Sequence, residues 1–347
     1  MDRHAPTLEE VAATAGVSRS TASRVINGAI GVAEHTKQAV ESAIESLGYV
    51  PNRAARSLVT RRTGSIALVI PESDDRILTD PFFAATLKGV HDALGEAEVQ
   101  LVLLIAPKER VPRIGQYLKA GHVDGAIVVS HHNDDGLEEA LVASRIPAYF
   151  VGRPYQPIPG VRFVDVDNVA GARIATEHLV ARGATRLVTI TGPLDMTAAE
   201  DRVTGWRQAI DASDVADLGS ADGDFTVQGG AEAMAALLEA HPDLDGVFAA
   251  SDQMASGALQ VLAAAGRRVP QDVALVGFDN LGIPETTKPR LTTVHNPVRE
   301  MAQTVTLRLL ARIFPGSDDA AAVEDESSDG ATSVVRFDPY LVPGESA

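Results

Sequence analysis

Cysteine is absent from this 347-residue chain. Its absence excludes disulfide bonds, thiolate metal sites and cysteine nucleophiles, and it fits a reducing compartment. The N-terminus lacks a basic stretch followed by an apolar core, so we expect no signal peptide. Long apolar runs are also missing, since a stretch such as Val99 to Ala106 falls far short of the ~20 residues that span a bilayer. We therefore expect a cytoplasmic protein.

The motifs of common enzymes are missing as well. No Gly-x-Gly-x-x-Gly turn, P-loop, Gly-x-Ser-x-Gly elbow or His-Glu-x-x-His site occurs in the sequence. The histidines show no metal-ligand spacing, and we interpret their only cluster, His131-His132, as a solvated loop. The carboxylate pair Asp165 and Asp167 has no visible acid–base partner. We expect neither an enzyme, nor a bound metal, nor a cofactor.

Positive charge is scarce overall, because the formal net charge is -17. Such a balance argues against a polyanionic partner, since lysine and arginine dominate the affinity for phosphates. The charge is unevenly distributed. Residues 1 to 62 hold eight Lys or Arg against six Asp or Glu, whereas the rest holds 22 against 41. The sequence therefore predicts a small, slightly basic head on an acidic body.

The head has the pattern of three short helices. Thr7 and Glu10 form a capping box at the first helix, and a glycine then permits a sharp reversal. Ser18 caps the second helix. Thr36 opens a third helix that closes at Gly48. Two helices joined around a glycine make a helix-turn-helix, a module that serves DNA binding or protein contact.

Side chains on the second helix favour DNA. Arg19, Ser20 and Arg24 project away from its apolar face, toward where base edges lie in a major groove. Further short polar side chains suited to the DNA interface are Thr7, Ser18, Thr21, Ser23, Asn27 and Thr36. The head is therefore predicted to bind double-stranded DNA.

Three runs in this region resemble one known family. Thr7-Leu-Glu-Glu-Val-Ala-Ala-Thr-Ala-Gly-Val-Ser, Ser23-Arg-Val-Ile-Asn and Leu47-Gly-Tyr-Val-Pro-Asn-Arg-Ala-Ala-Arg-Ser-Leu look like the headpiece and hinge of the lactose-repressor (LacI/GalR) family. The resemblance implies that Arg19, Ser20 and Arg24 read bases. It also implies a hinge helix that places Asn52, Ala55 and Leu58 in the minor groove, with the leucine as a wedge that bends the duplex. It divides the region into a headpiece, 1–50, and a hinge with its linker, 51–63.

Residues 64–347 read as two α/β units in tandem, because strand-like apolar runs alternate with helical segments. The strands expected in the first unit are Ser65 to Ile70, Val99 to Ile105, Gly125 to Ser130 and Ala148 to Val151, and those in the second are Phe163 to Val166, Leu187 to Thr191, Gly246 to Ala249 and Ala274 to Val276. The helices expected between them are Pro81 to Gly95, Pro112 to Ala120, Leu137 to Ser144, Ala170 to Arg182, Ala198 to Ala212, Val227 to Ala240 and Met254 to Ala265. Two such units suggest two lobes with a cleft between them.

Polar side chains at the carboxyl ends of these strands are the candidate ligand contacts, since ligands of such sheets bind there. These candidates are Ser251, Asp252, Asp279, Asn280 and Arg202, joined by the aromatic residues Phe82, Phe83 and Phe225. Carboxylates, an arginine and flat aromatics suit a polyhydroxylated ring. Each also has a plainer explanation: Asp252 or Asp167 could simply cap a helix, and one aromatic could belong to the core.

The family resemblance continues through the body to about residue 314. Its segments are Asp165-Val-Asp-Asn-Val-Ala-Gly-Ala, Arg202-Val-Thr-Gly-Trp, Ser251-Asp-Gln-Met-Ala-Ser-Gly, Val276-Gly-Phe-Asp-Asn and Leu291-Thr-Thr-Val. It implies a small all-α head on a two-lobed, periplasmic-binding-protein-like α/β domain whose chain crosses between the lobes three times. The implied N-lobe is about 64–162 and 295–316, and the C-lobe about 163–292 and 332–342.

The same resemblance assigns roles in the cleft. Arg202, Asp252 and Asp279 are implied effector contacts, Phe83 and Phe225 stacking partners, and Arg153 a further candidate. By family frequency the effector is a carbohydrate, although a nucleoside could present the same hydrogen-bonding edge. The implied function is a DNA-binding transcription regulator, usually a repressor, that binds a palindromic operator and is controlled by this effector. The alternative is a solute-binding protein of a transport system, which would need a signal peptide.

The tail departs from the family pattern. An acidic segment of small residues, 317–331, resembles a disordered insertion. The chain then ends Pro339-Tyr-Leu-Val-Pro-Gly-Glu-Ser-Ala without the arginine that the family commonly carries there. Heptad spacing for a tetramerising zipper is absent, so we expect a homodimer.

Overall fold

The computed structural model describes residues 6–26, 31–50, 62–95, 97–107, 110–133, 135–156, 162–315 and 334–347. The chain divides into two compact units, Met1–Gly64 and Ser65–Ala347. Four predicted DNA contacts, Asn27, Asn52, Ala55 and Leu58, and the acidic segment 317–331 lie outside the described residues. Within those ranges no helix combines the length and the apolarity needed to cross a membrane.

The described residues of the first unit form three helices, α1 (Leu8–Thr14), α2 (Arg19–Ile26) and α3 (Glu34–Leu47). The predicted capping box is present, because the Glu10 amide donates to Thr7 Oγ1 at 3.3 Å and the Thr7 amide donates to Glu10 Oε2 at 2.7 Å. Fully buried Val11, Ala22 and Val40 form the centre of a small core. Helix α3 begins at Glu34, two residues before the predicted start at Thr36. The prediction was wrong there because residue 33 is an alanine, which offers no side-chain cap to mark the start.

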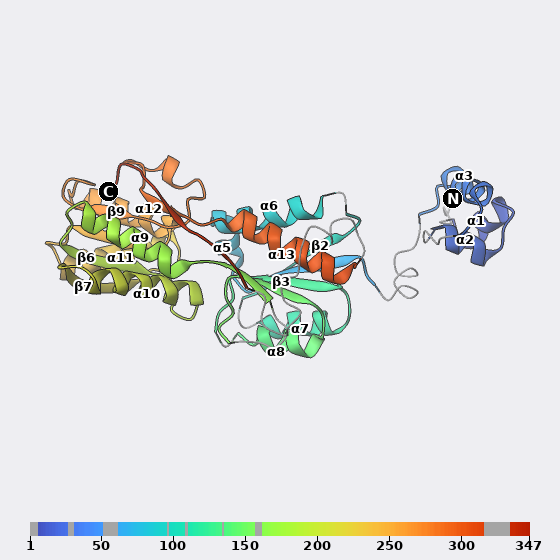
Figure 1. Cartoon of the computed structure of the whole chain (residues 1–347), viewed down its shortest axis with the longest axis horizontal. Coiled ribbons are helices and arrows are strands. Elements are labelled where there is room, and N and C mark those ends of the chain that lie inside the picture. Colours follow the sequence, from blue (N-terminus) through green and yellow to red (C-terminus); the bar gives the residue numbers. More distant parts are fainter. Residues whose placement is uncertain are drawn as a thin grey trace. The chain divides into compact units, whose positions relative to one another are not determined.

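The second unit contains two parallel sheets. The first sheet has the strand order β11-β5-β4-β3-β1-β2. Its strands are β1 (Ser65–Ile70), β2 (Gln100–Ile105), β3 (Gly125–Val129), β4 (Ala148–Val151), β5 (Arg162–Val166) and β11 (Val334–Phe337). Its helices are α5 (Asp74–Thr79), α6 (Pro81–Leu94), α7 (Val111–Lys119), α8 (Leu137–Ser144) and α13 (Val298–Ile313). Helices α6 and α13 cover one face and α7 and α8 the other (Figure 1), so strands β1 and β3 are buried throughout. We call this layered half the N-lobe.

The other half, the C-lobe, is built on a four-stranded parallel sheet of order β7-β6-β8-β9 and a small antiparallel pair, β10-β12. Its strands are β6 (Arg186–Thr191), β7 (Ala216–Asp222), β8 (Gly246–Ala249), β9 (Ala274–Val276), β10 (Thr293–His295) and β12 (Tyr340–Val342). Its helices are α9 (Asn168–Ala181), α10 (Thr197–Asp211), α11 (Val227–Ala240), α12 (Asp252–Ala264) and the short 3-10 helix η2 (Pro284–Thr286). Helix α9 packs on α10, and α11 packs on α12.

The expected division of strands between the lobes was wrong for two strands. Strand β5 lies beside β4, with Phe163 opposite Phe150, and β11 lies beside β5. Both strands thus extend the N-lobe sheet, although they were assigned to the second half. The chain crosses between the lobes after β5, between β10 and α13, and between β11 and β12. The three crossings implied by the resemblance are therefore present, but the first one follows β5 instead of preceding it.

Candidate functional site

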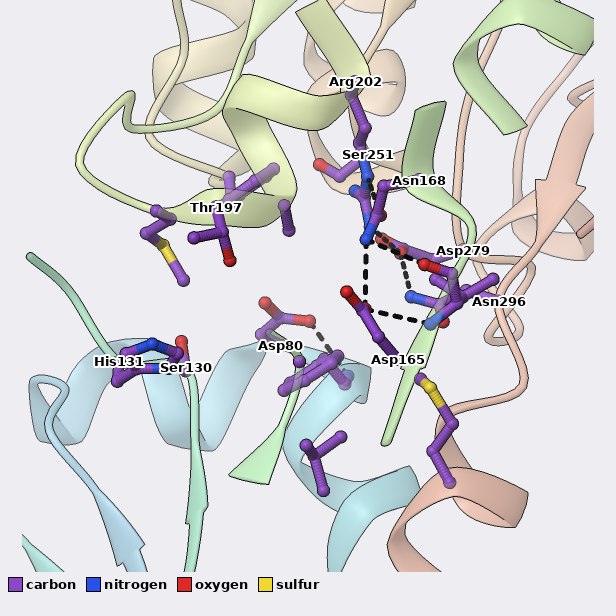
Figure 2. Close-up of a pocket in the computed structure, with 18 of the residues that line it drawn as sticks. Asp80, Ser130, His131, Asp165, Asn168, Thr197, Arg202, Ser251, Asp279 and Asn296 are labelled. Carbon is purple, nitrogen blue, oxygen red and sulfur yellow. Dashed lines mark hydrogen bonds and ion pairs between the residues drawn. The ribbon is translucent and has the colours of Figure 1, made fainter. Parts of the chain in front are cut away.

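A cleft between the N-lobe and the C-lobe gathers polar side chains at the carboxyl ends of parallel strands (Figure 2). It holds about 700 Å³ that protein atoms do not occupy, part of it open to solvent. A concave site where a few polar groups converge between two lobes suits a small-molecule ligand. Of the predicted effector residues, Phe82, Arg202, Phe225, Ser251 and Asp279 line the cleft, whereas Phe83, Arg153 and Asp252 do not.

Arg202, on α10, is the centre of the polar network in the cleft. Its Nε donates to Asn168 Oδ1 at 3.0 Å, and its Nη1 donates to the carbonyl oxygen of Ala250 at 2.5 Å. Its Nη2 lies 3.7 Å from Asp279 Oδ1. The guanidinium carbon lies 3.7 Å from the centroid of the Phe278 ring, close enough for a cation–π contact. Burial lowers the pKa of Arg202, while the surrounding carboxylates favour its charged form.

Two aspartates after neighbouring strands have different surroundings. Asp279 faces the cleft, accepts a hydrogen bond from Asn296 Nδ2 at 3.1 Å, and has a pKa that burial raises to about 6. Asp252 was expected to contact the effector, but its carboxylate lies behind the cleft, where it accepts hydrogen bonds from Thr293 Oγ1 at 2.6 Å and the Asn280 amide at 2.7 Å. Asp252 therefore fixes the loop that carries Asp279.

Of the aromatic candidates, likewise, only some face the cleft. Phe82 and Phe225 line the cleft, while Phe83 is 4 % exposed and belongs to the N-lobe core. Phe82 and Phe83 are consecutive residues in the first turn of α6, so their side chains point in different directions, and the two rings meet edge to face at 5.3 Å. A Cβ at Gly192 would lie 2.0 Å from the Phe225 ring, so only glycine leaves room for that ring. Phe225 has a φ of +62°, and this uncommon conformation sits directly at the cleft.

Several lining residues were not among the predicted effector contacts. Asp80 caps α6 by accepting a hydrogen bond from the Phe82 amide at 2.9 Å. Asp165 is the last residue but one of β5, and Asn168 starts α9 on the other side of the first crossing. These two positions lay within a quoted family segment, but the sequence does not reveal that β5 ends in the N-lobe beside the cleft. Asp167, between them, caps α9 through the Ala170 amide, as the plainer explanation of this residue had it.

The interpretation of the histidine pair as a solvated loop was wrong. His131 lines the cleft, is 5 % exposed, and packs edge to face on Phe150 at 4.8 Å. Burial lowers its pKa to about 4, so the ring is neutral near pH 7. His132 bridges the lobes: its Nδ1 lies 2.9 Å from Asp195 of the C-lobe, and its Nε2 lies 3.2 Å from Glu72 of the N-lobe. The two adjacent side chains therefore have different surroundings.

Further polar contacts join the lobes at the rim of the cleft. Arg153, expected at the effector, instead forms an ion pair with Asp201 at 2.8 Å. Its carbonyl oxygen accepts a hydrogen bond from Thr197 Oγ1 at 2.6 Å. The Gln253 side chain donates to the carbonyl oxygen of Thr79 at 2.9 Å. A ligand in the cleft would thus contact two lobes that are already joined by direct polar contacts.

The predicted DNA-reading side chains lie on α2 of the first unit. Arg19, Ser20 and Arg24 are exposed. Arg19 is paired with Glu9 at 2.7 Å, but both side chains are largely exposed, so little free energy opposes their separation. The Ser18 hydroxyl is used locally, because it accepts a hydrogen bond from the Thr21 amide at 3.1 Å. The remaining described candidates, Thr7, Thr21, Ser23 and Thr36, are partly buried.

A helix-turn-helix unit and a two-lobed ligand-binding domain define the class of ligand-responsive DNA-binding regulators. Residues 7–52 match the family of bacterial regulatory proteins of the lacI family, and residues 176–346 match the periplasmic binding protein-like domain.

Full-length relatives agree with both matches. The chain is 45 % identical to the HTH-type transcriptional regulator CelR of Thermobifida fusca, over 90 % of this chain and 93 % of the relative. It is 34 % identical to the ribose operon repressor of Halalkalibacterium halodurans, over 88 % and 90 %. This protein belongs to the LacI family of transcriptional regulators. These relatives are regulators and not enzymes, and they do not favour the transport alternative.

Two solved structures support the fold. A CelR–cellobiose complex superposes with a TM-score of 0.75 at 40 % identity, covering 99 % of this chain and 100 % of the other. The lac repressor dimer bound to operator and the anti-inducer ONPF superposes with a TM-score of 0.83 at 25 % identity, covering 99 % of each chain. The predicted family and fold class are therefore confirmed.

Proposed function

We propose that this regulator binds a near-palindromic operator as a homodimer in the cytoplasm, and that a sugar in the cleft changes its affinity for DNA. The observation that carries the proposal is the cleft itself, where Arg202, Asp279 and Phe225 of the C-lobe face Asp80 and Phe82 of the N-lobe. This arrangement offers hydrogen-bond partners for hydroxyl groups and ring faces for stacking. Cellobiose is the first sugar to test, because a 40 % identical relative holds it.

DNA would be read by the head. We propose that Arg19, Ser20 and Arg24 contact base edges in the major groove and that the hinge residues Asn52 and Leu58 contact the minor groove. Ser18, Thr21, Ser23, Asn27 and Thr36, with Thr7 and Ala55, complete the proposed interface. A single head buries too little surface for strong specific binding, so a dimer would engage two half-sites.

The effector would act through the lobes. A sugar that touches both lobes favours the lobe arrangement in which it fits, and a shift of the lobes changes the positions of the two hinge segments in a dimer. A coupling of about 1–3 kcal/mol, or 5–150-fold in affinity, is enough for a switch. The proposal includes no catalytic residue.

The deciding experiment is fluorescence anisotropy of the purified protein with its own upstream DNA, with and without a panel of sugars and nucleosides. We expect tight, salt-dependent binding to one palindrome, and a change in affinity caused by one sugar. Leu58→Gly and Arg24→Ala should weaken operator binding, whereas Arg173→Ala, which removes an exposed pair with Glu177, should not. Weak binding that does not depend on sequence under all conditions would contradict the proposal.

A further inference from the structure

Asp165 is a buried carboxyl group in the cleft that forms no ion pair with any of the described side chains. The residue is 7 % exposed and lines the cleft (Figure 2). Its Oδ1 accepts hydrogen bonds from the Val166 amide at 2.9 Å and Asn168 Nδ2 at 3.2 Å, and its Oδ2 accepts a longer one from the Arg153 amide at 3.3 Å. Within the described ranges, no lysine, arginine or histidine side chain forms an ion pair with it. Buried charges are normally paired, so an ionised Asp165 would have no direct ion-pair partner among the described side chains.

The arginines around the cleft are already paired with other carboxylates. Arg76 pairs with Glu72, Arg153 with Asp201 at 2.8 Å, and Arg202 lies 3.7 Å from Asp279. Among the described lining residues there is no lysine.

Two lining carboxyl groups therefore remain in excess. They are Asp80 and Asp165, and burial raises the pKa of both, that of Asp165 to about 7. His131 supplies no positive charge, because its ring is neutral near pH 7. Among the described lining residues, three acidic side chains, Asp80, Asp165 and Asp279, thus face two arginines, Arg76 and Arg202, and no unpaired cation is available to an anionic ligand.

From this geometry we infer that Asp165 accepts a hydrogen bond from a hydroxyl group of the effector, and that Asp165 and Asp80 make the cleft select uncharged sugars over phosphorylated or acidic ones. The inference rests on the proposed function, since it concerns the same cleft. A hydroxyl donor would satisfy a lone pair of a desolvated carboxylate. A phosphate would instead place like charges close together in a site of low dielectric, where repulsion is strong.

A purely structural role for Asp165 is the rival explanation, because its hydrogen bonds also hold the first crossing between the lobes. The two roles predict different ligand selectivity. Replacing a structural residue would change the affinities for neutral and anionic sugars alike. Replacing a ligand contact that repels anions would change the ratio of these two affinities.

The test is isothermal titration calorimetry of the full-length protein with cellobiose and with cellobiose 6′-phosphate at pH 8, above the pKa of Asp165 of about 7, so that its carboxyl group is mostly ionised. We expect the wild type to bind cellobiose about 100-fold or more tightly than its phosphate. Asp165→Asn should weaken cellobiose binding by about 10-fold or more, the effect of losing one charge-assisted hydrogen bond, and should narrow the ratio by about 10-fold. Asp80→Asn should independently narrow the ratio between the affinities for cellobiose and for its phosphate.

Asp167→Asn is the matched control, two residues along the chain, since Asp167 caps α9 outside the cleft lining and asparagine is an equally good cap. It should change neither affinity nor ratio. If the phosphate binds the wild type as tightly as cellobiose, or if Asp165→Asn changes neither quantity, the inference is wrong while the proposed function stands. If no neutral sugar binds or alters operator affinity, the proposed function itself fails, and the inference with it.

Discussion

Arg202 is the single residue whose removal should do most damage to the body. It is 5 % exposed and its guanidinium joins Asn168, Ala250 and Asp279. Replacement by leucine leaves Asp279 buried without its counter-charge. We therefore expect Arg202→Leu to lower the free energy of unfolding by about 3–5 kcal/mol, measured by urea denaturation near pH 7, and to abolish sugar binding. Arg173→Leu, at an exposed ion pair, should cost less than about 1 kcal/mol, and an equal loss in both variants would refute this assignment.

Replacing Asp165 should stabilise the protein, whereas replacing Arg202 should destabilise it. Its pKa rises from 3.8 to about 7 in the folded protein, mainly through burial, so between these values the folded state binds the proton more tightly than the unfolded chain. Stability therefore falls as the pH rises through this window. Asp165→Asn should raise the free energy of unfolding at pH 8 by up to about 4 kcal/mol, and by less at pH 5. Urea titrations at both pH values test this, and a destabilised variant at pH 8 would contradict it. A stabilised variant with weakened sugar binding is typical of a functional residue.

At the scale of secondary-structure elements, the sequence predicts where strands begin and end better than it predicts which strands lie side by side in a sheet. The bounds of β1, β4, β8 and β9 agree with the prediction, because buried parallel strands read as short apolar runs between turn residues. Strand β7 was not predicted, since its sequence, ADLGSAD, contains small and polar residues and is mostly exposed. Sheet membership of β5 could not be predicted either, because chain order does not specify which strand lies beside which.

The same limits decided which residues of the candidate site could be predicted from the sequence. Ser251 and Asp279 were found because they follow recognisable strands of the C-lobe. Arg202 was found because the sequence suggested a helix start there after such a strand's loop, although α10 begins at Thr197. Asp165 was read as a carboxylate without a chemical partner, since its place in the cleft depends on β5 pairing with β4. Side-chain direction was the other limit: both Phe82 and Phe83 were expected at the effector, but only Phe82 lines the cleft, while Phe83 belongs to the core.

The contact between α11 and α12 depends on the absence of a side chain at Gly257. A Cβ there would lie 2.0 Å from the carbonyl oxygen of Val227 and 2.7 Å from the Ala231 amide nitrogen. Alanine would favour the helix by up to about 1 kcal/mol, but it would force the two backbones apart. We expect Gly257→Ala to lower the free energy of unfolding by about 1–3 kcal/mol, measured by urea denaturation. An unchanged or increased stability would mean that the helices can separate at no cost.

At the scale of the whole molecule, His132 connects the two lobes through Asp195 and Glu72. Burial alone would lower its pKa, but hydrogen bonds to the two carboxylates outweigh burial and raise it. The stabilisation by protonated His132 is thus complete below pH 6.5 and is lost as the pH rises through the raised value. His132→Gln should cost about 1–3 kcal/mol of unfolding free energy at pH 6 and less at pH 8.5. Urea denaturation at the two pH values measures this, and an equal loss at both would exclude a role for the charge.

The division into a slightly basic head and an acidic body separates reading DNA from sensing the ligand. Arg19 is exposed on α2 of the first unit, whereas the cleft lies wholly within the second. Since a base-contacting arginine contributes about 1–3 kcal/mol of discrimination, Arg19→Ala should weaken operator binding by roughly 5–150-fold. Affinity for a scrambled duplex, which phosphate contacts dominate, should fall much less.

Anisotropy with the operator and the scrambled duplex measures both affinities, and Lys37→Ala, at an exposed pair with Glu41 on α3, is the control. Calorimetry with the sugar should give an unchanged affinity, because the mutated residue and the cleft belong to different units. An equal loss on both duplexes would show that Arg19 contacts only phosphates, and a weakened sugar affinity would show that the head and the body are not independent.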